Sequence, residues 1–387
     1  MNKLFIDIMY LYLMNQPFII KLPKVENKNL EFKNDKILFS PTINYPIITL
    51  GFHHYIKHTR KNFQKIIKNV KSDTTFYYVV NPFEPDIPNY EDDIKNQTNL
   101  YFKSKNITND FLKIWEILFI FNLISKNTKN GLINVPIDLF LEKMNLKSFN
   151  TFKNEKDIKK DNSCDIIIYN SEVKPEDDSF YENEFYCELI SNVINILKYQ
   201  SEGGNSIIKF YDSFTFVTLK IISVISSFFD EVLVYKPFIS RNSDSDKFLI
   251  LKNFKAGKQI DSMIKILEKI FKEIKSNSKQ FVTDIFPDMI LSKEFIDVFK
   301  FLNIRLANNH QIMMNEIIKY IQENNYYGDK YHLFRDNQIK SSKWWITNFY
   351  PPSVNIYEKN KEELEKLYKT TQEKLNLECL KFGETLL

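Results

Sequence analysis

The chain has 387 residues, a formal net charge of +4 and 43% hydrophobic residues. This length predicts one to three domains, and the mild positive charge permits a basic groove without requiring a nucleic-acid partner. The cysteines, Cys164, Cys187 and Cys379, lie far apart, which excludes a zinc motif or a disulfide framework. The apolar run 8–14 stops before Pro17 and is too short to span a bilayer. We therefore expect a cytoplasmic protein with no metal site and no membrane contact.

Residues 1–100 mix extended and helical patterns. Extended pieces are expected at 37–50 and 75–80, with a basic helix between them at 57–71 and a turn-rich link at 81–90. The lysines of the helix are typical of a solvated face and could also bind phosphates. They are Lys57, Lys61, Lys65 and Lys68. We expect this region to be an N-terminal α+β extension.

Residues 101–256 alternate between helical and β patterns. Apolar residues recur every three or four positions along 110–125, which predicts a helix packed on one face. Further helices are expected at 183–199 and 213–228. Short β runs are expected at 132–135, 165–169, 206–210, 232–235 and 248–252. This alternation predicts an α/β domain with a mainly parallel sheet.

Residues 257–387 are expected to be mostly helical. The candidate helices are 258–276, 293–303, 311–324 and 358–381. The predicted organisation is therefore an extension at 1–100, an α/β domain at 101–256 and a helical region at 257–387.

One stretch, 203–247, carries the strongest motif. Gly203-Gly204 leads as a turn into an apolar run that ends on Lys209, and a second run, 232–235, closes on Lys236-Pro237. The stretch resembles the C-terminal half of FtsJ-type RNA 2′-O-methyltransferases, a family that includes viral and eukaryotic cap methyltransferases. The resemblance implies a Rossmann-like methyltransferase fold that uses S-adenosylmethionine.

The family's catalytic tetrad is Lys-Asp-Lys-Glu, and the resemblance places it on Lys113, Asn170, Lys209 and Asp246. Such a tetrad positions a ribose hydroxyl and assists the loss of its proton. Asn170 keeps the shape of the family's aspartate but not its charge, and Asp246 is a shorter acid than glutamate. Lys209 could also be an ordinary surface lysine at the end of a strand.

The first tetrad lysine belongs to a helix that reads TNDFLKIWEIL over 108–118. In this register Lys113 takes the catalytic place. Glu116 is then expected to make an ion pair on the helix or to pack against a neighbour.

The methyl-donor loop of the family corresponds to LINVPIDLF at 132–140. Asn134, Pro136, Ile137 and Asp138 would be its cofactor-binding residues, but Ile137 and Asp138 replace the two glycines that let a ligand approach the backbone. Only about 27 residues separate this loop from the β run at 165, where a further strand, helix and strand need on the order of 50. The fold is therefore predicted to be shortened in its first half. The segment 147–161 that remains is polar and lysine-rich, and 154–162 is expected to be a flexible surface loop.

Two further features suggest nucleic-acid contact. Lys236 and Arg241 flank the mouth of the predicted site and are candidates for binding the RNA backbone. Trp344-Trp345 could stack on a base or pack in the core.

The histidines His53, His54 and His58 carry no fourth ligand and are not expected to bind metal.

Two functions compete. In the first, the chain is a degenerate, non-catalytic RNA-binding or scaffold subunit that has lost the methyl donor, because both donor glycines and part of the domain are missing. In the second, it is an active methyltransferase that uses S-adenosylmethionine and modifies capped mRNA. The resemblance also suggests a large DNA virus as the source, the cytoplasm of an infected cell or the virion as the location, and a partner protein subunit. A purely structural virion component is a third class.

Overall fold

The computed structural model describes residues 18–25, 36–42, 47–67, 79–87, 93–96, 98, 107–125, 127–143, 146, 148–158, 161–172, 181–323 and 328–349. The strands are β1 (Phe18–Lys21), β2 (Ile37–Ser40), β3 (Asn130–Ile133), β4 (Asn150–Phe152), β5 (Cys164–Tyr169), β6 (Gln200–Phe210), β7 (Phe229–Lys236), β8 (Lys247–Phe254) and β9 (Phe281–Ile285). The helices are α2 (Leu50–Ile67), α4 (Asn109–Phe121), α5 (Asp138–Lys143), α6 (Tyr181–Tyr199), α7 (Phe216–Ser226), α8 (Ile260–Ser276), α9 (Lys293–Gln322) and α10 (Asp329–Phe349).

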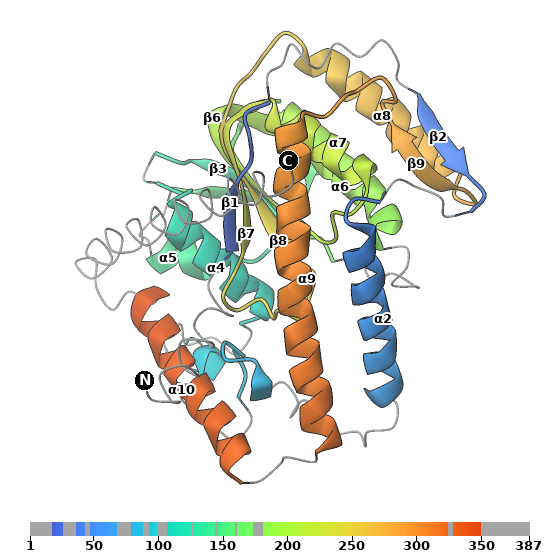
Figure 1. Ribbon diagram of the computed structural model, residues 1–387. Helices are drawn as coiled ribbons and strands as arrows, with labels where there is room; N and C mark the ends of the chain where they lie inside the picture. Colours follow the sequence, from blue (N-terminus) through green and yellow to red (C-terminus); the bar gives the residue numbers. More distant parts are fainter. Residues whose placement is uncertain are drawn as a thin grey trace.

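A seven-stranded sheet organises the molecule, in the order β1-β7-β8-β6-β5-β3-β4 (Figure 1). Neighbours from β4 to β6 pair in parallel, whereas β8 is antiparallel to both β6 and β7, and β1 is antiparallel to β7. Five of the seven strands therefore run in the same direction. The predicted α/β fold with a mainly parallel sheet and an antiparallel end is confirmed.

Helices cover both faces of this sheet. In Figure 1, α4 and α5 lie on one side and α6 and α7 on the other. Side chains alternate along the strands: Val232 and Val234 join the core under α6 and α7, whereas Leu233 and Tyr235 join the core under α4. This period of two is that of a strand buried on both faces.

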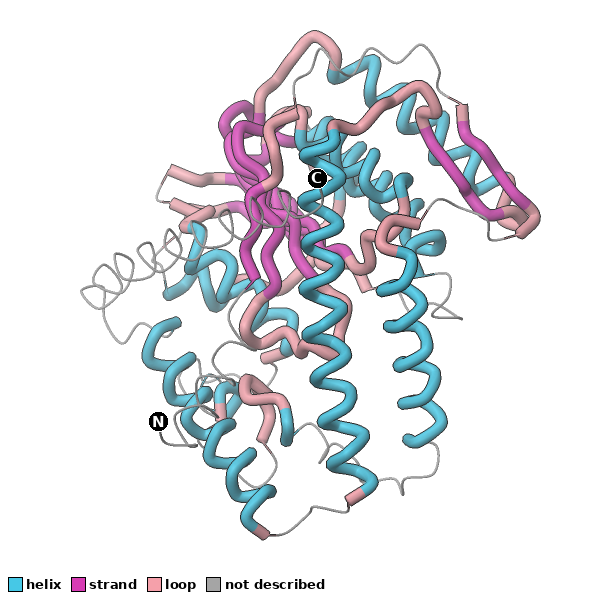
Figure 2. The backbone as a smooth tube through the Cα atoms, in the orientation of Figure 1, coloured by secondary structure: helices cyan, strands magenta, loops and turns pink. Residues whose placement is uncertain are grey.

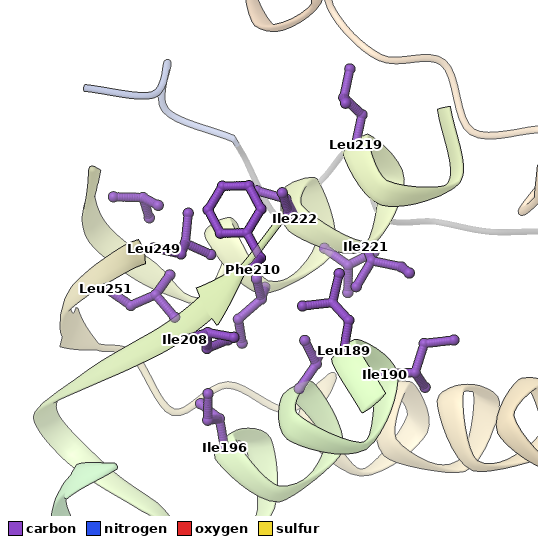
Figure 3. Close-up of a cluster of buried hydrophobic side chains, with 14 of the residues drawn as sticks. Leu189, Ile190, Ile196, Ile208, Phe210, Leu219, Ile221, Ile222, Leu249 and Leu251 are labelled. Carbon is purple, nitrogen blue, oxygen red and sulfur yellow. The ribbon is translucent and has the colours of Figure 1, made fainter. Parts of the chain in front are cut away.

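The first of these cores is almost entirely aliphatic and aromatic. Figure 3 shows Ile208 and Phe210 of β6 facing Leu189 of α6 and Ile222 of α7. Each such side chain contributes about 1.5–3 kcal/mol when it is fully buried. The packing fixes the strand ends, and with them the side chains that emerge at the carboxyl edge of the sheet.

Segments far apart in the chain join this framework. β1, from the N-terminal region, forms one edge of the sheet, and β2 pairs with β9 as a separate antiparallel hairpin-like ribbon (Figure 2). α2 packs along α9. The division into 1–100, 101–256 and 257–387 remains a prediction, although each of these regions shares a sheet or a core with another.

Several predicted elements need correction. The pieces 293–303 and 311–324 are one continuous helix, α9, and α10 was not predicted. The polar segment 147–161 contains β4, and the loop expected at 154–162 contains a 3-10 turn at Glu155–Asp157, so more of the first half survives than its length suggested. The candidate helix at 358–381 lies outside the described residues. In the described part of the chain, no helix has the length and apolarity needed to cross a membrane.

The double glycine is also not a turn. Gly203 and Gly204 lie inside β6, where Gly203 has φ +75°. A Cβ on Gly204 would lie 1.9 Å from Nε2 of Gln200 and 2.8 Å from the backbone oxygen of Asp165. The glycines thus let β6 bulge around the buried Gln200 beside β5.

We expect Gly204→Ala to lower the free energy of unfolding by about 1–3 kcal/mol, because the new methyl group overlaps Gln200 and the backbone of β5. Urea titration followed by circular dichroism measures this. Gly257→Ala is the matched control, since a Cβ there meets nothing within 4 Å. Equal stability of the two variants would contradict the account of the bulge.

Candidate functional site

The candidate site lies where three strands reach one edge of the sheet. β5 and β6 end there, and antiparallel β8 begins there, with Phe210 paired to Lys247. The first turn of α4 points to the same edge, and Thr108 caps this helix by accepting a hydrogen bond from the backbone N of Phe111 at 3.1 Å. These ends surround a cleft of about 610 Å³. Its lining residues are Arg60, Thr108, Asn109, Asp110, Lys113, Glu172, Lys209, Tyr211, Ser243, Asp244, Ser245 and Asp246.

Lys113 and Asp246 form a buried ion pair in this cleft. The Nζ of Lys113 donates to Oδ2 of Asp246 at 2.7 Å, so the shorter acid at this position still reaches the lysine. Burial disfavours both charges, but their mutual attraction prevails. It raises the pKa of Lys113 and lowers the pKa of Asp246.

Lys209 pairs with a different carboxylate, Asp110 in the first turn of α4. Its Nζ donates to Oδ1 of Asp110 at 3.2 Å, and the Nζ of Lys113 lies 3.8 Å from the same oxygen. The side chain of Lys209 is only 4% exposed. The two predicted catalytic lysines therefore share one carboxylate oxygen, although 96 residues separate them in sequence.

Asn170 follows β5 and completes the group. It lies beside Lys209 on the neighbouring strand, because Tyr169 of β5 pairs with Ile208 of β6, and its backbone N donates to Oδ1 of Asn134 at 2.8 Å. The Oδ1 of Asn170 is buried without a partner in the part of the chain that the structure describes. The four predicted tetrad residues are thus brought to one place, joined by a fifth residue, Asp110, that was not predicted.

Asp110 could have been found from the sequence. It stands three residues before Lys113, so both lie on one face of a helix, and acidic residues in a first turn are stabilised by the helix dipole. Burial opposes its ionisation, but the ammonium groups of Lys209 and Lys113 overcome that effect and lower the pKa of Asp110. It is therefore a carboxylate at neutral pH.

The prediction that Lys236 binds the RNA backbone is wrong for the chain as folded. Lys236 is 5% exposed, and its Nζ donates to the backbone oxygens of Asp244 and Asp246 at 2.8 and 3.0 Å and to Oγ of Ser240 at 3.0 Å. It holds the loop 237–246 that carries Asp246, and its ammonium is not available to a phosphate.

Arg241 also has a structural partner. Its Nε and Nη2 donate to the two carboxylate oxygens of buried Glu84 at 2.7 and 2.6 Å. This fork fixes the same loop to the N-terminal region. Arg60 of α2 lines the cleft instead and pairs with Asp212 at 3.2 Å. The RNA contact of Arg241 remains a prediction.

The predicted donor loop follows β3. Asn134, Pro136 and Asp138 are exposed, and Asp138 opens α5, but Ile137 is 1% exposed and belongs to the core under α4. Ile137 therefore ties the loop to the core.

Two further contacts bear on a methyl donor. The side chain of Asn134 bridges the ends of β3 and β5, and the carboxylate that follows β4, Glu155, accepts hydrogen bonds from Tyr169 and Asn195 at 3.0 Å each. Of the four predicted donor residues, Ile137 replaces a glycine and is buried, and Asn134 is engaged with the end of β5. The residues present do not fit this cofactor.

The charges that line the cleft nearly balance. Arg60, Lys113 and Lys209 face four carboxylates, Asp110, Glu172, Asp244 and Asp246. Burial, with nearby Asp246, raises the pKa of Asp244. A lining of this kind suits a neutral polar group, such as a sugar hydroxyl, better than a phosphate.

Glu116 is buried rather than paired with a cation. It accepts hydrogen bonds from the hydroxyl of Tyr235, from the backbone N of Phe238 at 2.8 Å and from Nε1 of Trp345 at 2.9 Å. Of the two predicted roles, an ion pair or packing against a neighbour, the structure shows the packing role. Trp345 is fully buried, and Trp344 packs on Phe238. These contacts attach α10 to α4.

Comparison with known proteins agrees with this architecture. Residues 123–254 match the family described as FtsJ-like methyltransferase. This chain therefore carries an FtsJ-like methyltransferase domain. The match contains Asn170, Lys209 and Asp246, whereas Lys113 precedes it.

Relatives include viral proteins and proteins named as cap methyltransferases. An uncharacterised protein of Acanthamoeba polyphaga mimivirus is 27% identical over 65% of this chain and 71% of its own length. The cap-specific mRNA (nucleoside-2′-O-)-methyltransferase of Autographa californica nuclear polyhedrosis virus is 27% identical over 30% of this chain and 45% of its own. An inactive cap-specific mRNA (nucleoside-2′-O-)-methyltransferase 1B of Caenorhabditis briggsae is 24% identical over 41% of this chain and 17% of its own. The chain thus spans less than half of the two relatives named for cap methylation.

The buried Glu116 predicts a pH-dependent stability. Burial raises its pKa from 4.5 to about 7 in the folded chain. The folded state then binds more protons than the unfolded state between these values, so stability is greatest below pH 4.5 and falls as the pH rises to 7. We expect this group alone to lower the free energy of unfolding by about 3 kcal/mol over that range.

Urea unfolding at pH 5 and pH 8, followed by tryptophan fluorescence, measures the effect. Glu116→Gln removes the titrating group, at the cost of one accepting oxygen because the amide NH2 only donates, and should flatten the difference between the two pH values. Glu294→Gln, at an exposed site in the first turn of α9, should leave it unchanged. The assignment fails if Glu116→Gln has the same pH dependence as the parent.

Proposed function

We propose that this protein is a non-catalytic RNA-binding subunit of the cap 2′-O-methylation type, which binds a ribose of capped mRNA in the cleft between α4 and the ends of β5 and β6. The observation that carries the proposal is the assembly of Lys113, Lys209, Asp110 and Asp246 within one cleft. The domain and the relatives named for cap methylation support RNA as the ligand.

The geometry of the cleft supports a sugar hydroxyl as the recognised group. Buried lysines that are held by carboxylates are fixed in position, and each ammonium has three donors, so a bound hydroxyl can accept from Lys209 while it donates to Asp110. Because the lining charges nearly balance, the RNA backbone would be attracted from outside the cleft. The exposed lysines of α2 are candidates for that attraction.

The predicted methyl-donor loop, residues 132–140, distinguishes this proposal from its alternative. The alternative is an active RNA 2′-O-methyltransferase that uses S-adenosylmethionine. The assembled lysine–carboxylate group favours the alternative, since an acceptor site of this kind can position a hydroxyl for reaction. Against it stand Ile137, which is held in the core, and Asn134, which bridges the ends of β3 and β5. No step of methyl transfer can be derived from these residues.

We expect isothermal titration calorimetry with S-adenosylmethionine to detect no binding at millimolar ligand, because the loop that would hold it packs on the core through Ile137. A parallel assay would follow methyl incorporation into a short capped RNA. Micromolar binding of S-adenosylmethionine, or methylated RNA as product, would reverse the ranking of the two functions.

We expect Lys209→Ala to reduce binding of a capped RNA oligonucleotide about tenfold, since one charge-assisted hydrogen bond to the ribose is lost. Fluorescence anisotropy measures the affinity. Lys272→Ala, an exposed lysine on α8, is the control for a general loss of positive charge. Equal losses in both variants would argue against specific ribose recognition, and no binding by the parent protein would end the proposal.

A further inference from the structure

Lys209 depends on a single carboxylate. It is 4% exposed, and Asp110 is its only ion-pair partner within the residues that the structure describes. A buried ammonium without a counter-charge is strongly destabilising. Asp246 cannot serve instead, because its two oxygens are engaged by Lys113, Lys236 and Ser240. The charge of Lys209 in this cleft is therefore maintained by Asp110.

Asn170 lies beside Lys209 on the neighbouring strand, because Tyr169 of β5 pairs with Ile208 of β6. The amide of Asn170 also contributes to the lowered pKa of Asp110. An ionised carboxylate only accepts hydrogen bonds, so an amide that faces it presents its NH2 group. This orientation agrees with the unpartnered, buried Oδ1 at the other end of the amide. The side chain at position 170 therefore lies near the lysines that pair with Asp110, but it is uncharged.

The two positions come from independent parts of the fold. Asp110 belongs to the first turn of α4, where the helix dipole stabilises a negative charge. Asn170 follows the end of β5 in the sheet. A single carboxylate is enough for this corner of the cleft, because two ionised carboxylates in contact would repel each other.

We propose that Asp110 is the positioning residue of the cleft: it holds Lys209 toward the ribose hydroxyl and supplies the negative charge that position 170 lacks. The proposal rests on the proposed function for the identity of the ligand. Independently of the ligand, a carboxylate at position 110 or at position 170 should be able to neutralise Lys209.

The test is a charge exchange between the two positions. The variants are Asp110→Asn, Asn170→Asp and the double variant Asp110→Asn/Asn170→Asp, compared with the parent. Asp261→Asn is the matched control, because Asp261 also stands in the first turn of a helix, α8, but is exposed. Each protein is measured by thermal unfolding without ligand. Each is then titrated with two capped RNA oligonucleotides that differ only in a 2′-hydroxyl or a 2′-O-methyl group on the first nucleotide.

Without ligand, Asp110→Asn should lower the Tm by about 5 °C or more, because Lys209 loses its counter-charge. The double variant should recover most of this loss, whereas Asp261→Asn should change the Tm little. Asn170→Asp alone should not stabilise the protein, since it places a second carboxylate near Lys209, which Asp110 already neutralises. If the double variant is no more stable than Asp110→Asn, the proposal is overturned.

With RNA, the parent should prefer the hydroxyl form by about tenfold. Asp110→Asn should lose this preference, and the double variant should regain it. A role of Asp110 in folding alone would leave the preference of the folded variant intact, and that result would overturn the positioning role. If the parent binds neither RNA, the proposed function fails, and the Tm comparison still decides whether the two positions exchange one charge.

Discussion

Two lysines brought to one edge of a sheet need carboxylates to neutralise them, and this requirement shapes the cleft. Lys113 is held by Asp246 at 2.7 Å and Lys209 by Asp110 at 3.2 Å. Neither ammonium is exposed enough for water to stabilise it alone. The loop 237–246 is anchored by the buried Lys236 and by the paired hydrogen bonds of Arg241 with Glu84. These contacts fix the position of Asp246 beside Lys113.

The two halves of the site differ in how the chain uses its polar groups. On the acceptor side, lysines and carboxylates face a cleft of about 610 Å³. Around the predicted donor loop, Ile137 is part of the core. Asn134 accepts a hydrogen bond from the residue after β5, and Glu155 accepts one from Asn195 of α6. Where the resembled family has glycine for close approach to a ligand, this chain has Ile137, whose side chain packs in the core.

Much of the fold could be predicted from the sequence, because apolar residues recur at the spacing of helices and strands along most of residues 101–276. The helix of Lys113 and the strands on either side of Lys209 were found by their hydrophobic repeats. β4 and α10 were missed for physical reasons: β4 has three residues, and α10 has a weakly apolar face. Its attachment depends on two contacts of Trp345 and Phe349 with α4, which no local pattern reveals.

The site was predictable where it follows strand ends and not where it depends on tertiary charge balance. Asn170, Lys209 and Asp246 stand at strand termini, so their convergence follows from the sheet. The pairing of Lys209 with Asp110, and the burial of Lys236, depend on how α4 and the loop 237–246 meet that edge. A sequence gives the charges but not the partners that neutralise them.

The cleft around Lys113 and Lys209 is intact, whereas the predicted methyl-donor loop is altered. NMR of the lysine ammonium groups tests this difference most directly. In one sample, the Nζ signals of Lys113 and Lys209 are followed while capped RNA and S-adenosylmethionine are added in turn. The account predicts that the RNA shifts the Lys209 signal and that S-adenosylmethionine leaves both signals in place. Shifts on S-adenosylmethionine with none on RNA would contradict it.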